Sequence, residues 1–220
     1  MAIYYRFGIT LARLCFTLFA RWEVEGKEYI PPRGPLIVVA NHLSNADPPF
    51  IMASLNRRVF ALGKRSLFKK WWASNFLLGA GVYPVSRGRP DTQAVRWVLK
   101  LLNRDQVVLL FPEGKRSEDA TMKEAHPGIG YLACKSESPI LPVAITGTEN
   151  LSGLWRIAVP FCRIRVRIGQ PFTVPLIQGR ADTSIMRQYA DMIMARVADL
   201  LPREFRGYYD RKFAGERDYS

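Results

Sequence analysis

The feature that most constrains the fold is a series of short apolar runs separated by segments with helical spacing. Five runs are rich in β-branched residues and are predicted to be strands: 35–40, 59–62, 82–85, 107–111 and 140–146. Four intervening segments have apolar residues three or four apart and are predicted to be helices: 48–55, 67–78, 92–102 and 129–135. Strands alternating with helices predict a single α/β domain with a mixed, mostly parallel central sheet flanked by helices.

Two later segments extend this domain. In residues 162–168, apolar side chains alternate with three arginines, which predicts a strand and favours a charged edge strand. Residues 183–201 repeat apolar side chains at helical spacing, with Asp182 or Thr183 available as a cap and Pro202 after the end. We therefore expect an N-terminal helix at 1–25, a main domain at 26–202 and a charged tail at 203–220.

The net charge of +13 predicts an anionic partner. Nucleic acid, anionic lipid headgroups, phosphorylated substrates and an acidic carrier protein all fit such an excess, as does a basic surface without a partner. Basic residues are spread along the chain, without a finger-type Cys/His spacing or an RNA-binding signature, so nucleic acid is not the expected partner. Three cysteines and two histidines favour a reducing, cytoplasmic setting and predict neither a disulfide framework nor a metal site.

The N-terminal segment 3–22 is apolar but interrupted by Arg6, Arg13 and Arg21. Its charge-free run is far shorter than the roughly 20 residues that span a bilayer. On a helix the three arginines fall within roughly 80° of one another, and a separate apolar arc contains Tyr4, Phe7, Leu11, Leu14 and Leu18. This pattern fits an amphipathic membrane-interface helix with arginines toward the headgroups, and equally a helix packed on its own domain.

A candidate catalytic pair follows the first predicted strand. His42 and Asp47 are five residues apart, about 140° around a regular helix, and Pro48 disfavours helix at Asp47. We expect a turn at His42 and a helix with Asp47 at its N-cap, one carboxylate oxygen on the imidazole and the other capping the helix. A histidine oriented in this way can act as a general base, and a purely structural pair is the alternative. Its target is either Ser44, which lacks a Gly-x-Ser-x-Gly elbow and better suits a turn, or a substrate hydroxyl.

A second candidate site lies where strand 107–111 runs into Phe-Pro-Glu-Gly-Lys-Arg-Ser. Gly114 would let a ligand approach the backbone, while Arg116 and Lys115 offer charge for a phosphate. Glu113 could accept a hydrogen bond from a hydroxyl of the bound molecule. An ordinary charged surface turn is the alternative.

Four segments in order resemble the motifs of the glycerolipid acyltransferases typified by 1-acylglycerol-3-phosphate (lysophosphatidic acid) acyltransferases: Asn41-His-x4-Asp47, Val85-Ser-Arg87-Gly88, Phe111–Ser117 and Ile140–Gly147. This resemblance, over about 26–174, implies a glycerol-3-phosphate acyltransferase-like fold with His42 and Asp47 as the catalytic pair. It also implies substrate-binding roles, which fall on Arg87, Glu113, Gly114, Arg116 and Pro142. Lys115 stands where the family usually has threonine, and it is a further candidate for the phosphate. No motif places a carboxylate partner beside His126, which is interpreted as structural or peripheral.

The implied reaction moves a fatty acyl group from acyl-ACP or acyl-CoA to the free hydroxyl of a lysophospholipid, lysophosphatidic acid first, without cofactor or metal. The resemblance implies peripheral or monotopic attachment at the cytoplasmic side of the cell membrane, and the cations and tryptophans of Lys69–Trp72 favour docking on an anionic bilayer. Three alternatives stay open: another lysolipid acceptor, a Ser44-dependent lipid hydrolase, and a non-catalytic anionic-lipid binder. The oligomeric state is not predicted.

Overall fold

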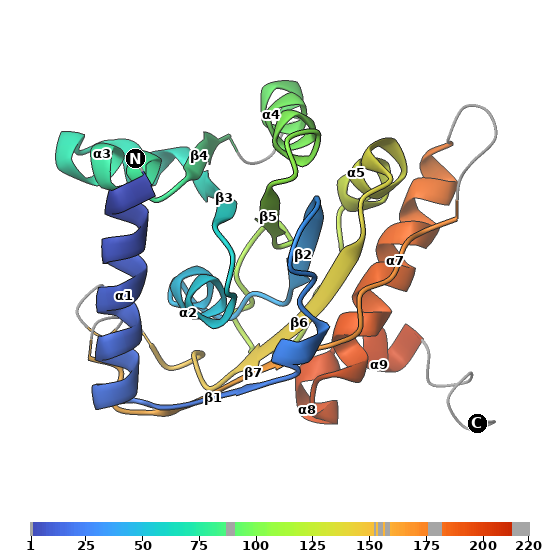
Figure 1. Cartoon of the computed structure of the whole chain (residues 1–220). Coiled ribbons are helices and arrows are strands. Elements are labelled where there is room, and N and C mark those ends of the chain that lie inside the picture. Colours follow the sequence, from blue (N-terminus) through green and yellow to red (C-terminus); the bar gives the residue numbers. More distant parts are fainter. Residues whose placement is uncertain are drawn as a thin grey trace.

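A single seven-stranded sheet runs through the molecule, in the order β1-β7-β6-β2-β5-β3-β4 (Figure 1). The computed structural model describes residues 2–86 (side chains from Tyr5), 91–151, 153, 156, 159–175 and 182–212. The strands are β1 (Arg21–Glu25), β2 (Leu36–Ala40), β3 (Val59–Lys64), β4 (Val82–Val85), β5 (Val107–Leu110), β6 (Ile140–Thr146) and β7 (Arg163–Ile168). The helices are α1 (Ala2–Phe19), α2 (Asp47–Ser54), α3 (Trp71–Gly79), α4 (Thr92–Leu102), α5 (Gly128–Ser136), α7 (Thr183–Asp199), α8 (Arg203–Arg206) and α9 (Tyr208–Lys212), with short 3-10 turns η1 (Lys27–Tyr29) and η2 (Arg65–Phe68).

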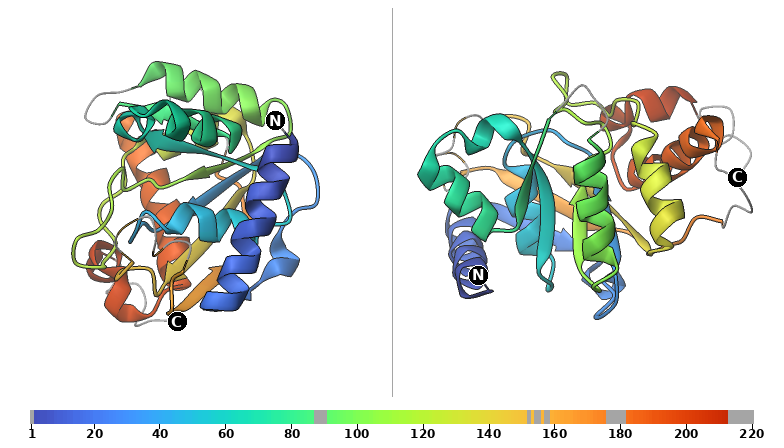
Figure 2. Two further views of the ribbon diagram at one scale, coloured as in Figure 1. Left: turned by 90° about the vertical axis from the view of Figure 1, so that its left-hand side faces the viewer. Right: turned by 90° about the horizontal axis from the view of Figure 1, so that it is seen from above.

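The sheet is mixed and mostly parallel, as the sequence predicts. Strands β6, β2, β5, β3 and β4 are mutually parallel, β7 is antiparallel to β6, and β1 is parallel to β7. Alternate side chains of each central strand enter two cores: α1 and α2 cover one face, and α4, α5 and α7 cover the other (Figures 1 and 2). Burial on both faces explains why these strands are continuous apolar runs in the sequence.

The arginine-rich strand β7 is not an edge strand, so that expectation is wrong. It lies between β6 and β1, a strand that the sequence pattern did not predict. Glu23 of β1 pairs with Arg163 at 2.8 Å and with Arg165 at 3.2 Å, and Glu25 pairs with Arg167 at 3.0 Å. The acidic residues of β1 thus meet the basic face of β7, which makes the outer pairing favourable.

Helix α1 packs on the domain and also leaves an apolar face exposed. Phe16 stacks on Phe50 of α2 with ring centroids 3.7 Å apart. Arg13 donates to the carbonyls of Ala53 and Leu55 at the end of α2, at 2.9 and 3.1 Å. The opposite face exposes a stripe formed by Phe7, Leu11, Leu14 and Leu18.

The expected common arginine face of this segment is therefore wrong. Arg13 caps α2, because that helix ends beside α1 with free carbonyls. Arg21 belongs to β1, because the helix ends at Phe19. Strand β1 also occupies the last five residues of the 1–25 segment assigned to the helix. Among the described helices, none has the length and apolar character needed to cross a bilayer.

The C-terminal part of the chain belongs to the same fold. Helix α7 begins at Thr183 with Asp182 as its cap, as predicted, and packs against α5 and β6. Helices α8 and α9 occupy residues 203–212 of the predicted tail and return to the loop before α5, where the N–H of Tyr208 donates to the carbonyl of Met122 at 3.0 Å.

Candidate active site

Three neighbouring parallel strands, β6, β2 and β5, end at the same edge of the sheet. The residues just past these ends include His42 after β2, Glu113 after β5 and Thr148 after β6. All three are buried. Carboxyl ends of parallel strands are where α/β sheets build their sites, so this edge is the candidate active site.

His42 and Asp47 form the pair that the sequence predicts. Nδ1 of His42 lies 2.7 Å from Oδ2 of Asp47. An ionised carboxylate can only accept, so Nδ1 carries the proton and Nε2 is the nitrogen that can take another. His42 is 7% exposed, and its ring stacks on Phe111 with ring centroids 4.2 Å apart. The geometry is that of a general base with a fixed tautomer.

Asp47 is the first residue of α2 rather than its N-cap, which is Ala46, and its second oxygen does not cap the helix; both findings correct the expected geometry. Its Oδ2 also accepts from the backbone N–H groups of Leu43 and Ser44, at 2.6 and 2.7 Å. The residues that follow, Pro48 and Pro49, have no N–H to offer. The carboxylate therefore turns back onto the His42 turn and holds both its side chain and its backbone.

Three residues to which the sequence analysis assigned no role complete this environment. Thr148 is fully buried and its hydroxyl donates to Oδ1 of Asp47. Gly147, at φ 90°, makes the turn that brings Thr148 there after β6. The Asn41 side chain bonds both the N–H and the carbonyl of Ile145 at 2.9 Å, so it ties the end of β2 to β6. The only sequence signal for Thr148 is its place just past the fourth motif.

The loop after β5 holds the backbone of His42 on both sides. The N–H of His42 donates to Oε1 of Glu113 at 3.1 Å, and its carbonyl accepts from the N–H of Ser117 at 2.8 Å. Oε2 of Glu113 accepts from the N–H of Lys123 at 2.9 Å. Both oxygens of Glu113 thus bond the protein backbone, and its observed role is to place His42.

Burial raises the pKa of Glu113 to about 7, with a smaller contribution in the same direction from the charge of Asp47. The backbone N–H groups of Lys123 and His42 act in the opposite direction, because they stabilise the ionised form. Glu113 therefore changes charge close to neutral pH, next to the His42–Asp47 pair.

Comparison with known proteins identifies the family. Residues 21–146, which include the His42–Asp47 turn, β5 and its loop, and β6, match the sequence profile of the acyltransferase family. The chain belongs to that family. It is 25% identical over 169 residues to the 1-acyl-sn-glycerol-3-phosphate acyltransferase of Bacillus subtilis, covering 76% of this chain and 81% of the relative. It is 33% identical over 136 residues to the human 1-acyl-sn-glycerol-3-phosphate acyltransferase alpha, covering 59% of this chain. The chain covers 47% of the human protein, about half its length.

The fold of this acyltransferase also matches a solved structure. The 1-acyl-sn-glycerophosphate (LPA) acyltransferase from Thermotoga maritima superposes with a TM-score of 0.68 at 24% sequence identity. The match covers 89% of this chain and 78% of that one. The mixed α/β domain predicted from the sequence is thereby confirmed.

The hydroxyl of Ser44 makes hydrogen bonds that stabilise the turn. Its hydroxyl donates to the carbonyl of Leu151 at 2.8 Å and accepts from the N–H of Ala46 at 3.3 Å. The side chain is buried. These bonds direct the oxygen to the turn rather than to the imidazole.

The expected phosphate-binding residues lie at the open side of the same loop. Lys115 and Arg116 are exposed between Gly114 and Ser117. Gly114 has φ 70°, and a Cβ there would come within 2.7 Å of the ring of His126, so His126 lies against this loop. Arg87 lies outside the described residues.

Pro142 lies away from the exposed 113–117 loop. It is buried in β6 beside Val39, and its Cγ would lie 3.0 Å from a Cβ at Gly169. This location is within the sheet, three residues before Ile145, to which Asn41 bonds. Its contact with an acceptor stays a prediction.

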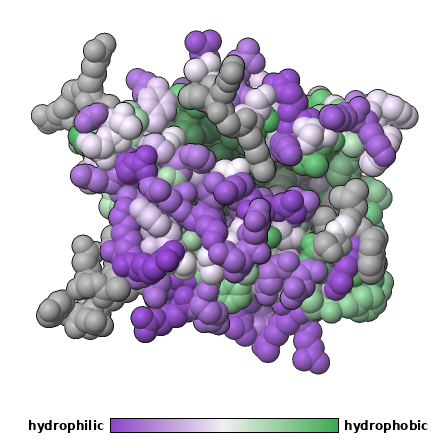
Figure 3. All heavy atoms as spheres, turned by 180° about the vertical axis from the view of Figure 1, so that it is seen from behind, coloured by the Kyte–Doolittle hydropathy of each residue, from purple (hydrophilic) through white to green (hydrophobic). Residues whose placement is uncertain are grey.

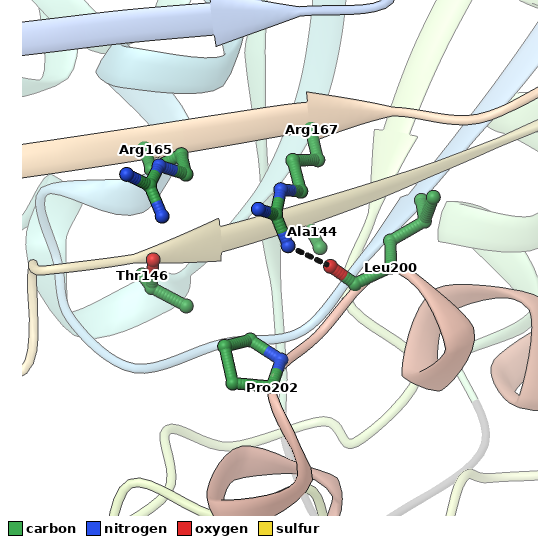
Figure 4. Close-up of a pocket in the computed structure, with 6 residues that line it drawn as sticks. All are labelled: Ala144, Thr146, Arg165, Arg167, Leu200 and Pro202. Atoms are coloured by element: carbon green, nitrogen blue, oxygen red, sulfur yellow. Dashed lines mark hydrogen bonds between the residues drawn. The ribbon is translucent and has the colours of Figure 1, made fainter.

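A small pocket elsewhere in the acyltransferase does not include the pair. It lies between β6, β7 and the end of α7 (Figure 4), and its lining consists of Ala144, Thr146, Arg165, Arg167, Leu200 and Pro202. Arg167 donates to the carbonyl of Leu200 at 3.3 Å and pairs with Glu25, and Arg165 pairs with Glu23. These arginines are engaged within the fold, in contrast to the exposed cations of the 113–117 loop.

Proposed function

We propose that this acyltransferase transfers a fatty acyl group from a thioester donor, acyl-ACP or acyl-CoA, to the free hydroxyl of lysophosphatidic acid, forming phosphatidic acid. The observation that carries the proposal is the His42–Asp47 pair, at 2.7 Å, with its backbone held by Glu113 and Ser117. The relatives are named as 1-acyl-sn-glycerol-3-phosphate acyltransferases, which supports lysophosphatidic acid as the first acceptor to test.

The proposed reaction is direct transfer. Nε2 of His42 takes the proton of the acceptor hydroxyl as that oxygen attacks the thioester carbonyl carbon. The new C–O bond forms, the C–S bond breaks, and the leaving thiolate takes the proton back from the imidazolium. Asp47 stabilises the imidazolium and keeps Nδ1 protonated, so Nε2 faces the reaction in each cycle.

The acceptor phosphate is proposed to bind on the open side of the loop. Arg116 offers a planar fork for phosphate oxygens and Lys115 offers a point charge, and both are exposed. Arg87 is proposed as a third contact. Gly114, with φ 70°, shapes the loop that presents these cations, and His126 rather than the headgroup occupies the space where its Cβ would lie.

The enzyme is proposed to act while attached peripherally to the cytoplasmic side of the membrane. Helix α1, which carries the exposed stripe, lies on the same side of the molecule as α3 (Figures 1 and 2). The exposed residues of α3 include Trp71, Trp72, Phe76 and Leu78. Seen from behind, hydrophobic side chains gather along the right-hand edge of the molecule, the side on which α1 lies (Figure 3). Apolar patches beside cations are what an anionic bilayer binds. The Lys69–Lys70 pair just before α3 supplies such cations, and Lys70 lies over the Trp72 ring at 5.7 Å.

A panel of lysolipid acceptors against acyl-ACP and acyl-CoA donors, read by mass spectrometry, tests the proposed activity. We expect phosphatidic acid from lysophosphatidic acid with at least one donor, and little product from choline or ethanolamine lysolipids. Preference for another lysolipid would replace the acceptor, and no product with any pair would contradict the proposal. A parallel arm without acceptor tests hydrolysis, for which we expect no acyl-Ser44 species.

A further inference from the structure

The C-terminal helices hold the loop between β5 and α5. The N–H of Met122 donates to the carbonyl of Phe205 at 2.8 Å, and the N–H of Tyr208 donates to the carbonyl of Met122 at 3.0 Å. Farther along the loop, the N–H of Ala125 donates to the hydroxyl of Tyr209 at 3.0 Å. Three hydrogen bonds therefore fix the loop at both ends of a four-residue stretch.

Between these anchors lies the residue that bonds Glu113. The N–H of Lys123 donates to Oε2 of Glu113 at 2.9 Å, and Oε1 of the same carboxylate accepts from the N–H of His42 at 3.1 Å. A continuous path of hydrogen bonds and three residues of loop backbone thus runs from Tyr209 to the backbone of the catalytic histidine.

Tyr209 is built into this position. Its side chain is fully buried, and its hydroxyl lies 3.5 Å from Oδ1 of Asp191, which pairs with Lys212. Burial raises the pKa of Tyr209, so the phenol stays neutral and keeps its proton. A neutral hydroxyl can accept from Ala125 and donate to Asp191 at the same time.

We propose that Tyr209 is a positioning residue: by fixing Ala125 it holds the N–H of Lys123 on Glu113, and through Glu113 it sets the backbone of His42 for acyl transfer. This inference rests on the proposed function of His42 for its effect on turnover. Its structural part, the coupling of Tyr209 to the His42 N–H, is testable without activity. It gives residues 203–212 a part in the chemistry that the sequence did not predict.

The test compares Tyr209→Phe with Tyr208→Phe in the full chain. Tyr208 is the matched control, because its hydroxyl accepts from Lys212 at 3.2 Å rather than from the loop, while its backbone bond to Met122 survives the change. Two readouts are needed: hydrogen exchange of the His42 and Lys123 amides, and kcat and KM with lysophosphatidic acid and an acyl thioester.

We expect Tyr209→Phe to speed exchange at the His42 and Lys123 amides about tenfold, with amides of β3 and β4 unchanged. Loss of one buried hydrogen bond corresponds to about a tenfold fall in kcat, and KM should stay within about twofold. Tyr208→Phe should match the wild type in both readouts. In a Glu113→Gln background, the effect of Tyr209→Phe on kcat should largely disappear, because the path is already broken.

Three results would overturn the inference. Exchange at His42 that is unchanged, or that rises equally across the sheet, would show no specific coupling. A normal kcat despite faster exchange would show that the coupling does not serve the reaction. Full additivity with Glu113→Gln would show that Tyr209 acts by another route. If His42→Ala is as active as the wild type, the proposed function fails, whereas the exchange result still decides whether the coupling exists.

Discussion

The buried carboxylate of Asp47 orders the whole turn that carries the imidazole. It accepts from the His42 ring, from two backbone N–H groups and from the hydroxyl of Thr148. A buried carboxylate with this many donors fixes its partners, because any displacement leaves a charged oxygen without a hydrogen bond. The orientation of His42 is therefore a property of the folded turn and exists before substrate binds.

Removing one donor from Asp47 should be costly. Thr148→Val keeps the shape but leaves Oδ1 of Asp47 without the hydroxyl, and we expect a loss of about 2 kcal/mol in the free energy of unfolding. Thermal or urea unfolding measures it, and Thr148→Ser should restore most of the loss. Thr146→Val is the control, because Thr146 lies on the sheet at the small pocket rather than at Asp47. Equal stability of Thr148→Val and Thr146→Val would contradict the assigned bond.

Glu113 should make the stability depend on pH in a particular direction. Its pKa is about 7 in the folded chain against an ordinary value of 4.5, so the folded state holds the proton more tightly. Its contribution to stability is fully present below about pH 4.5 and is lost as pH rises to about 7, with a limit on the order of 3 kcal/mol.

Glu113→Gln removes this titration. The free energy of unfolding of the variant minus that of the wild type should therefore rise between pH 5 and pH 8. The amide itself changes stability by an amount that does not depend on pH, so it does not affect this slope. Unfolding by urea at several pH values measures the difference. A difference that is flat or falls over this range would show that Glu113 does not titrate as described.

At this scale the sequence predicts the pair but not its surroundings. Pro48 indicates a break that can fold Asp47 back on His42, and this is what the structure has. The donor Thr148 is 101 residues from Asp47. Only strand order brings β6 beside β2, and the local pattern around Thr148 does not contain that order.

At the scale of elements, the loop after β5 carries both Glu113 and Ser117, which hold the backbone of His42, and the exposed cations. Its shape depends on Gly114, whose φ of 70° is unfavourable for other residues. The ring of His126 fills the space that a side chain at Gly114 would need. The histidine interpreted from the sequence as structural or peripheral is thus a neighbour of the proposed phosphate site.

Comparing Gly114→Ala with Gly34→Ala distinguishes the cost of backbone strain from the effect of the contact with His126. Gly34 has φ 81° and open space around it, so its variant shows the strain alone, about 1–2 kcal/mol. Gly114→Ala should show similar strain and also shift the NMR signal of His126 and raise KM for the acceptor. The chain has two histidines, so the signals can be assigned with His126→Gln. An unchanged His126 signal in Gly114→Ala would contradict the contact.

Elements buried on both faces were the most predictable from sequence. Strands β2, β5 and β6 match apolar runs because both of their faces are buried, and helices α4 and α7 match the helical period because one face of each is buried. The apolar pattern does not predict strand β1, Arg-Trp-Glu-Val-Glu, because its glutamates pair with the arginines of β7 and no apolar run results. The edge assignment of β7 failed for the same reason: the partner of its basic face is 140 residues away.

At the scale of the molecule, exposed apolar residues concentrate on α1 and α3, whereas the apolar residues of the two cores on either side of the sheet are buried. Phe7 is 69% and Trp71 is 77% exposed, values unusual for such side chains in a folded protein. The sequence left two interpretations of the N-terminal helix open, and the structure combines features of both: one face packs on the domain and the other faces outward.

Membrane attachment through these helices should be lost by polar substitutions that keep the helix. We expect Leu11→Gln with Leu14→Gln, and separately Trp71→Gln with Trp72→Gln, to weaken binding to anionic vesicles at least tenfold, since each buried side chain contributes roughly 1.5–3 kcal/mol. Cosedimentation with phosphatidylglycerol-containing and pure phosphatidylcholine vesicles measures it, and salt should weaken binding to the anionic vesicles.

Tyr131→Gln is the matched control, because Tyr131 is an exposed aromatic residue on α5. His42→Ala should bind vesicles like the wild type. Wild-type binding by both helix variants would refute attachment by this surface.

The most direct measurement for the account is acyl transfer by His42→Ala beside Ser44→Ala, each with its thermal unfolding curve. We predict that His42→Ala folds but forms no phosphatidic acid above background from lysophosphatidic acid and an acyl thioester, whereas Ser44→Ala retains transfer. Full transfer by His42→Ala, or an inactive but folded Ser44→Ala with an acyl-Ser44 species in the wild type, would contradict the account.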